Sequence, residues 1–243
     1  MEKETLLEVT QISKSYQSKS VLNDLSFSIN QGEIVGLLGH NGAGKTTAFY
    51  ITMGLIKPDQ GAIYFQGLDI TKLPIHKRAL LGIGYLSQEP SIFRSLTVEE
   101  NLLSILETLD LTPSDKKKRL DNLLQEMNLT HLAKKKAQLL SGGEKRRTEI
   151  ARTLVRSPSL ILLDEPFANI DPKTISDLKK MILQLKHKGI SILITDHNAR
   201  EIFSLADRSY LLASGHILAS GSTQDLLHNE DVRHTYLGHD FAL

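Results

Sequence analysis

The chain has 243 residues, 40% of them hydrophobic, and a formal net charge of +1 at pH 7. This length can bury a full core, and the balanced charge argues against a general polyanion-binding surface. The absence of cysteine excludes disulfides and thiolate metal sites, and the longest aliphatic runs are far shorter than the roughly 20 residues that cross a bilayer.

The N-terminal part of the chain predicts two strands. Residues 1–5 are charged and are not followed by an apolar segment with a cleavage site, so we expect no secretory signal. Residues 6–16 have the apolar spacing of a strand, and apolar and polar residues alternate over 25–29. We expect these strands to form an antiparallel layer. Tyr16, near the end of the first strand, could stack on a nucleotide base, although an aromatic residue there more often belongs to a core or rim.

A glycine-rich segment then follows a buried strand at 34–38 and precedes a helix at 46–53. It matches the phosphate-binding pattern of Gly, four free positions and Gly-Lys-Ser/Thr. The glycines allow backbone N–H groups to surround phosphate oxygens, and the helix N-terminus adds positive potential. Lys45 should reach the β- and γ-phosphates, Thr46 should offer its hydroxyl to Mg²⁺, and Thr47 should only pack. The candidate nucleotide-binding residues are Gly39, His40, Asn41, Gly42, Ala43, Gly44, Lys45, Thr46 and Thr47.

A mostly helical insertion is predicted over residues 88–156. Its basic runs at 116–119 and 134–136 contain no interleaved aromatic residues, so we expect solvated faces and no nucleic-acid partner. The elements expected before and within the insertion are strands at 63–65 and 83–86 and helices at 75–81, 98–109 and 120–127.

After the insertion, predicted strands and helices alternate. This alternation is typical of a parallel sheet that is covered by helices on both faces. Pro172 suits the first turn of a helix, where a backbone N–H is not needed. The expected elements are strands at 160–163, 190–195, 210–212 and 216–219 and helices at 172–185 and 199–205.

Two adjacent acids, Asp164 and Glu165, end an apolar strand, and the strand ends of a parallel sheet present groups to ligands. In a phosphoryl-transfer site the first acid can hold Mg²⁺ and the second can orient or deprotonate the attacking water. Gln88 follows another strand and could touch Mg²⁺ or that water. His197 also follows a strand and could contact the γ-phosphate, although either side chain alone could be an ordinary surface residue.

The segment Leu-Ser-Gly-Gly-Glu at 140–144 completes a set of motifs in which the chain resembles the ATP-binding subunits of ABC transporters over nearly its whole length. The glycine-rich segment, Gln88, this signature, the acid pair and His197 match the motifs of that family in the same order. The resemblance implies an α/β fold with a P-loop NTPase (RecA-like) core and an antiparallel β layer, at about 1–87 and 157–243, and an inserted helical subdomain at about 88–156.

The resemblance also implies ATP and Mg²⁺ as cofactors and a head-to-tail dimer, in which the signature of one copy closes on the ATP of the other. A hydroxyl and amides that open a helix suit a γ-phosphate on physical grounds as well. Tyr16 matches the aromatic residue that stacks on adenine in this family. The implied signature residues are Ser141, Gly142, Gly143 and Glu144, the implied metal-binding residues are Thr46, Gln88 and Asp164, and the implied catalytic residues are Glu165, His197 and Gln88.

One residue and one loop depart from the common family pattern. His40 stands where proline is usual, outside the required positions, and we attach no function to it. The loop Asn169-Ile170-Asp171 replaces the commoner Ser-Ala-Leu-Asp form.

Stretches around residues 82–94, 161–168 and 194–198, together with the ending Tyr236-Leu237-Gly238, Phe241 and Leu243, closely resemble the ATPases of lipopolysaccharide export transporters. This resemblance implies a homodimer beneath two integral inner-membrane permease subunits, at the cytoplasmic face of the membrane and without direct contact with the lipid. Phe93 and Arg94 would then contact the membrane subunits, whereas a buried Phe93 would belong to the core of the insertion.

Other functions are weighed against this one. The chain could serve another ABC transporter, such as a branched-chain amino acid importer. Soluble ABC ATPases of translation or DNA repair fit less well, because they usually carry two nucleotide domains or long coiled-coil insertions. A module that does not hydrolyse ATP would be expected to lose Lys45, Glu165 or His197, and all three are present.

Overall fold

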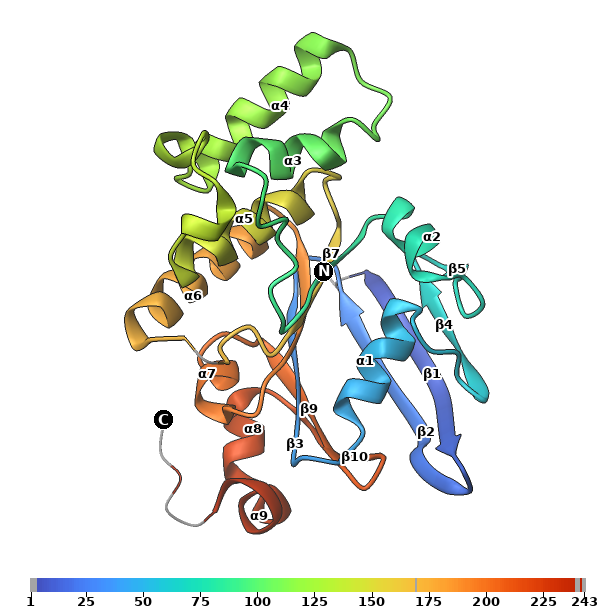
Figure 1. Ribbon diagram of the computed structural model, residues 1–243. Helices are drawn as coiled ribbons and strands as arrows, with labels where there is room; N and C mark the ends of the chain where they lie inside the picture. The colour runs from blue at the N-terminus through green and yellow to red at the C-terminus, as the bar shows by residue number, and fades with distance from the viewer. Residues whose placement is uncertain (1–3, 169, 239–240, 242–243) are drawn as a thin grey trace.

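The computed structural model describes residues 4–168, 170–238 and 241. It contains two sheets and a group of helices at one end of the molecule (Figure 1). The helical group lies at the top of the view, the larger sheet below it, and the smaller antiparallel sheet to the right. This arrangement confirms the predicted α/β core, antiparallel layer and helical insertion.

The antiparallel sheet has the strand order β2-β1-β4-β5. The alternation that predicted the second strand also describes its burial, since Leu25, Phe27 and Ile29 are all buried. The edge strand at Leu68–Asp69 was not predicted, because it has only two residues and both are exposed. The strands are β1 (Thr5–Tyr16), β2 (Lys19–Asn30), β4 (Gln60–Phe65) and β5 (Leu68–Asp69).

The larger sheet has the strand order β10-β9-β3-β8-β7-β6. It is parallel except at one edge, where β10 pairs with β9 in the antiparallel direction, so the expectation of a parallel sheet was wrong for β10. Ser214 and Gly215 join these two strands and have φ values of 48° and 83°, as tight hairpin turns require. The strands are β3 (Ile34–Gly39), β6 (Ile83–Leu86), β7 (Leu160–Asp164), β8 (Ser191–Thr195), β9 (Arg208–Ala213) and β10 (His216–Gly221).

Each face of the larger sheet is covered by its own apolar cluster. Along β7, Leu160 and Leu162 pack into the cluster beneath the antiparallel layer and α1 (Lys45–Met53). Ile161 and Leu163 pack into the opposite cluster, which includes the helical insertion. The sheet is therefore buried on both faces, as its nearly continuous apolar strands predict.

The insertion contains α3 (Val98–Leu106), α4 (Pro113–Glu126) and α5 (Gly142–Leu154). The predicted helix at 120–127 begins seven residues earlier, because Thr112 caps it and Pro113 occupies its first turn. The remaining helices are α2 (Ile75–Leu80), α6 (Pro172–His187), α7 (Ala199–Phe203), α8 (Thr223–His228) and α9 (Glu230–Val232), followed by a π-helical turn at Arg233–Leu237. Within the described residues, no helix is long and apolar enough to cross a membrane.

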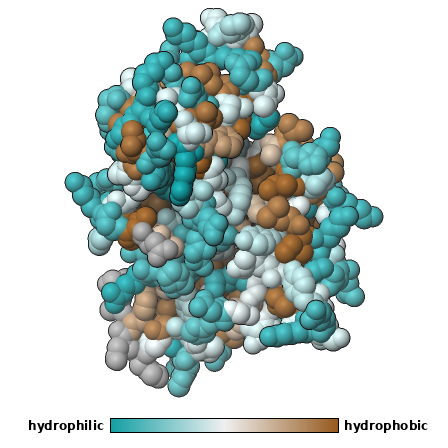
Figure 2. Space-filling view, in the orientation of Figure 1, coloured by the Kyte–Doolittle hydropathy of each residue, from teal (hydrophilic) through white to brown (hydrophobic). Residues whose placement is uncertain are grey.

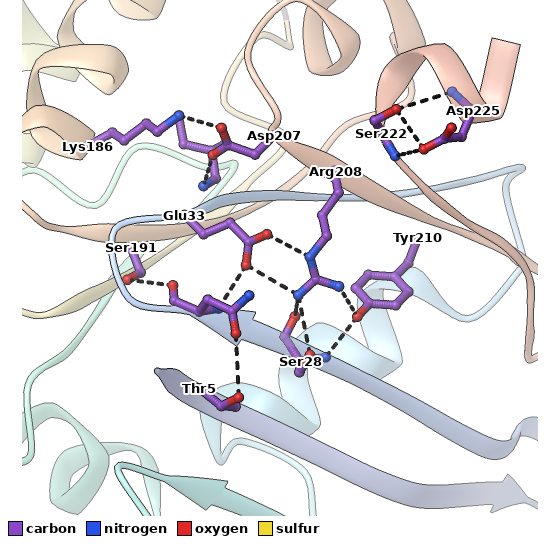
Figure 3. A network of polar contacts seen from close by, with 12 residues as sticks. Thr5, Ser28, Glu33, Lys186, Ser191, Asp207, Arg208, Tyr210, Ser222 and Asp225 are labelled. Atoms are coloured by element: carbon purple, nitrogen blue, oxygen red, sulfur yellow. Dashed lines mark hydrogen bonds and ion pairs between the residues drawn. The ribbon is translucent and has the colours of Figure 1, made fainter. Parts of the chain in front are cut away.

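A polar network connects the two sheets (Figure 3). Arg208 on β9 donates from Nε to Glu33 Oε1 at 2.6 Å and from Nη2 to the carbonyl of Ser28 on β2 at 2.7 Å. Its Nη1 donates to the hydroxyl of Tyr210, which accepts a hydrogen bond from the Ser28 amide. Separately, Asp207 binds Lys186 at 2.5 Å and the Ile34 amide at 2.9 Å. The Arg208 and Tyr210 bonds join the antiparallel layer to the larger sheet at the start of β9, at the end of the sheet opposite the glycine-rich segment.

A second buried arginine, Arg78 on α2, binds the end of α1. Its guanidinium donates to the carbonyls of Ile51 and Thr52 at 2.9 and 2.7 Å, and to those of Thr71 and Leu73 at 3.1 and 2.9 Å. Burial lowers the pKa of Arg78 to about 10, so the side chain remains charged at neutral pH. A cation at the C-terminal carbonyls of a helix is favourable.

Replacing Arg78 with methionine should lower the free energy of unfolding by about 3 kcal/mol or more, because several buried carbonyls lose a charged donor. Lys77→Met on the same helix removes an exposed charge and should change stability by no more than about 0.5 kcal/mol. Urea unfolding of both variants measures the difference. Equal stability of the two variants would show that the Arg78 contacts contribute little.

Candidate nucleotide site

The glycine-rich segment leaves β3 and enters α1, as predicted. Close packing requires glycine at two of its positions. A Cβ on Gly39 would lie 2.4 Å from the Leu212 carbonyl oxygen, and a Cβ on Gly44 would lie 2.6 Å from the Leu22 side chain. Gly44 also has φ of 104° at the cap of α1, which glycine adopts without strain. The loop is thus held close to β9 and β2.

Lys45 is 7% exposed at the start of α1. Its Nζ donates to the carbonyl of Gly39 at 2.6 Å and to that of His40 at 3.0 Å. Burial lowers the pKa of Lys45, and the carboxylates of Glu165 and Asp196 oppose this shift. The ammonium group therefore sits inside the loop near two acids, at a point where an anionic ligand would relieve its desolvation.

The acid pair lies at the carboxyl end of β7. Asp164 is 7% exposed and accepts a hydrogen bond from the Thr195 hydroxyl at 2.9 Å. Burial raises the pKa of Asp164, and the bond from Thr195 opposes the shift. The Glu165 amide donates to the Thr195 carbonyl at 2.9 Å, and Glu165 has φ of 42°, a backbone conformation that is uncommon for residues other than glycine. Thr195 on β8 therefore supports both acids.

Glu165 gathers the two other predicted catalytic side chains. Gln88 donates from Nε2 to Glu165 Oε2 at 2.9 Å. His197 Nδ1 lies 3.7 Å from the same oxygen. The structure thus brings Gln88, Glu165 and His197 together from three different strand ends.

The signature residues cap α5. Ser141 Oγ accepts from the Glu144 amide at 3.3 Å, and Glu144 Oε2 accepts from the Ser141 amide at 2.8 Å; this is a capping box. Gly142 and Gly143 form the first positions of the helix. A cavity of about 500 Å³ borders Ser141, with Arg147 and Lys173 also in its lining. Among the described residues, no hydrogen bond joins this signature segment to residues 39–47.

Sequence reasoning missed a pair of side chains on α5 that hold the Gln88 loop. Arg146 Nη1 donates to the Ser87 carbonyl at 2.8 Å, and Glu149 Oε1 accepts from the Ser91 amide at 2.6 Å. The two side chains also pair with each other at 3.1 Å. Ser87 and Ser91 lie on either side of Gln88 in the chain, so Arg146 and Glu149 connect the signature helix to the Gln88 loop. A charged pair three residues apart on a helix was visible in the sequence, but its target was not.

Tyr16, Thr46 and His40 also belong to the predicted nucleotide site. Tyr16 is 44% exposed beside Lys14, whose Nζ lies 5.6 Å from the ring centre, and Thr46 is exposed. His40 Nε2 donates to the Thr235 carbonyl at 2.6 Å, and its ring lies 5.0 Å from that of Tyr236. The described tail residues therefore contact the glycine-rich segment.

Phe93 is 49% exposed, so the interpretation of a core residue was wrong. The Arg152 guanidinium lies 5.1 Å from the centre of its ring. The neighbouring Arg94 is also exposed. Asn169 and Leu243, which the sequence analysis also named, lie outside the described residues.

The comparisons with known proteins agree with this geometry. The family model described as ABC transporter matches residues 22–168. The chain belongs to the ABC transporter family. As a member, it is an ATPase that couples ATP hydrolysis to transport.

Several relatives match this chain over nearly its whole length. It is 50% identical over 240 residues to the lipopolysaccharide export system ATP-binding protein LptB of Haemophilus influenzae, covering 98% of this chain and 100% of that protein. Identity to LptB of Escherichia coli K12 is 47%, covering 96% of this chain and 97% of that protein. The ATP-binding cassette MJ1267 in its ADP conformation superposes with a TM-score of 0.86 at 30% identity, covering 97% and 99% of the two chains.

Proposed function

We propose that this chain is the ATPase of a lipopolysaccharide export transporter. The observation that carries the proposal is the 50% identity to an LptB over 98% of this chain and all of that relative. ATP binding and hydrolysis would drive two integral membrane subunits that extract lipopolysaccharide from the inner membrane toward the outer membrane. The ATPase would lie at the cytoplasmic face and would not touch the lipid.

The active form in this proposal is a homodimer whose two copies are arranged head to tail, with two ATP molecules bound between them. The glycine-rich segment and the signature both contain exposed residues that a second copy could contact. They lie on different elements, with no hydrogen bond between them in the described part of the chain. A second copy would place its Ser141 hydroxyl and helix N-terminus opposite the phosphates held near Lys45.

We also propose the division into a core at about 1–87 and 157–243 and a helical part at about 88–156.

The residues around the acid pair suit Mg²⁺. Thr46, Gln88 and Asp164 offer a hydroxyl, an amide oxygen and a carboxylate, which are the hard oxygen donors that this ion prefers. The buried Asp164 carboxylate, whose pKa is raised by burial, would gain a compensating charge. When bound, the ion would neutralise charge on the β- and γ-phosphates. Glu165 would then act as the base for the attacking water, and His197 would contact the γ-phosphate.

A groove between α2 and α5 suits a membrane subunit. It encloses about 240 Å³, and Ile75, Ile105, Arg152 and Arg156 belong to its lining. Figure 2 shows apolar surface over the neighbouring α1 and α2. Arg152 joins the groove to the exposed ring of Phe93, so an apolar anchor and cationic groups occur together, as in many binding hot spots.

Replacing Phe93 with alanine should weaken assembly with the membrane subunits by roughly 30-fold, the effect of losing a hot-spot side chain of about 2 kcal/mol. The ATPase activity of the isolated chain should stay unchanged. Leu111→Ala, which removes another exposed apolar side chain of the helical part, is the control. Co-purification of each variant from membranes measures assembly, and normal assembly of the Phe93 variant would remove Phe93 from the interface.

The proposed cargo is tested by isolating the chain from detergent-solubilised membranes and identifying the membrane proteins that accompany it. The complex is then reconstituted in vesicles that contain lipopolysaccharide. We expect two permease subunits and ATP-dependent release of lipopolysaccharide to a soluble acceptor. Recovery of the permeases of an amino acid importer, with no lipopolysaccharide release, would contradict the proposal.

A further inference from the structure

Asp196 is a buried acid to which the sequence analysis gave no role. It directly follows β8 and is 1% exposed. Its two oxygens bind backbone amides on two different loops: Oδ1 accepts from the Asn198 N–H at 2.9 Å and Oδ2 accepts from the Phe167 N–H at 3.3 Å. One carboxylate therefore joins the loop after β7 to the loop after β8.

The two amides that it holds adjoin the reactive side chains. Phe167 lies two residues after Glu165 in a turn that is closed by the Ala168 amide, which donates to the Glu165 carbonyl at 3.2 Å. Asn198 directly follows His197. The His197 ring faces both acids, with Nδ1 3.6 Å from Asp196 Oδ1 and 3.7 Å from Glu165 Oε2. A shift of either loop would change the separation of Glu165 and His197.

We propose that Asp196 is a positioning residue for ATP hydrolysis, which holds Glu165 and His197 in their working arrangement through the backbone amides of Phe167 and Asn198. Asp196 acts through these loops and is not required to touch ATP itself. The proposal concerns the hydrolytic step and does not depend on the cargo.

The chemistry of the position explains why an acid is needed. A carboxylate offers a separate acceptor oxygen to each of the two N–H donors, which lie on different loops. Burial raises the pKa of Asp196, so the folded protein bears a cost for keeping a carboxylate there. An asparagine would fill the same space, but its NH₂ group would face one of the N–H donors. A serine could close the local turn to Asn198 with its hydroxyl, but its shorter side chain has no second oxygen to replace Oδ2 at the Phe167 amide.

Asp207 supplies a matched control at the opposite edge of the same sheet. Its carboxylate also accepts from a backbone amide, that of Ile34, and binds Lys186 (Figure 3). Asp207→Asn therefore removes a comparable structural contact at a distance from Glu165 and His197. If Asp196 only stabilised the fold, the Asp196 variants and Asp207→Asn should lose stability and ATP hydrolysis to a similar extent.

The test compares Asp196→Asn, Asp196→Ser and Asp207→Asn in the full-length chain by steady-state ATP hydrolysis and thermal unfolding. Both Asp196 variants should lose kcat at least about tenfold, because small displacements of reacting groups are costly, while KM changes by less than about twofold. Asp207→Asn should lower Tm and leave kcat within about twofold of the parent. Asp196→Ser is included because a small uncharged residue removes the burial cost and should fold even if Asp196→Asn does not.

Hydrogen exchange of the Phe167 amide, detected by NMR, adds a readout of the contact itself. It should quicken in Asp196→Ser and stay at the parental rate in Asp207→Asn. Parental kcat in a folded Asp196 variant would overturn the proposal. An equal loss of kcat in Asp207→Asn, or a raised KM with kcat unchanged, would also overturn it, since either result would assign Asp196 to stability or to nucleotide binding.

Discussion

Replacing Glu165 with glutamine should reduce steady-state ATP hydrolysis at least about 100-fold, the contribution expected of a general base. Glutamine keeps the size of the side chain, and its carbonyl oxygen can still accept from Gln88, which now donates to Glu165 Oε2 at 2.9 Å. The amide cannot take a proton from water. ATP should therefore still bind and should accumulate in a closed dimer, which size-exclusion chromatography with ATP measures.

Glu89→Gln is the matched control for this variant. Glu89 is an exposed carboxylate next to Gln88 in the same loop. Glu89→Gln therefore tests whether the loss of any negative charge in this loop lowers ATP hydrolysis. The Glu89 variant should keep parental turnover. Brisk turnover by the Glu165 variant would remove Glu165 from the role of base and leave Gln88 or His197 to orient the water.

Replacing Lys45 with alanine should weaken ATP binding itself by roughly 10- to 150-fold, which corresponds to the loss of charge-assisted hydrogen bonds worth about 1.5 to 3 kcal/mol. Lys45 is the buried cation within the glycine-rich segment, and its Nζ donates hydrogen bonds to the Gly39 and His40 carbonyls. Titration with ATP under conditions that prevent hydrolysis measures the affinity.

Lys57→Ala removes a lysine from an exposed position after α1 and should leave the affinity unchanged. Thermal unfolding of the Lys45 variant checks that its loop remains folded. Unchanged ATP affinity in a folded Lys45 variant would count against the phosphate-binding role of the whole segment.

Periodicity predicted the core elements well because their burial follows the same period. The strand at 83–86 has the predicted bounds, and the buried strand at 34–38 is extended only by Gly39. The prediction of α4 missed its first half, since residues 113–119 contain no apolar residue to define a face. The signals for its true start, Thr112 and Pro113, were present and would have sufficed. The C-terminal helix α8 has a similar signal in the capping box of Ser222 and Asp225.

For the site, the motifs located residues along the chain but not their partners. Gln88 and Glu165 are 77 positions apart, and only the order of the strands in the sheet places them in contact. The same holds for Asp196, whose bond to the Phe167 amide spans 29 positions. Such contacts depend on tertiary packing and leave no local period in the sequence. The residues that reasoning from motifs missed are therefore those that bind backbone groups of another segment.

The head-to-tail dimer is the central claim, and cross-linking tests it most directly because the chain contains no cysteine. Asn41→Cys places an exposed thiol in the glycine-rich segment, and Leu139→Cys places another at a side chain that is 64% exposed beside the signature. The two single variants, both with Glu165→Gln, are mixed and treated with a short bismaleimide. We expect cross-linked pairs that contain one copy of each variant when ATP is present, and none without ATP or with Lys45→Ala added. Absence of such pairs at saturating ATP would contradict the account.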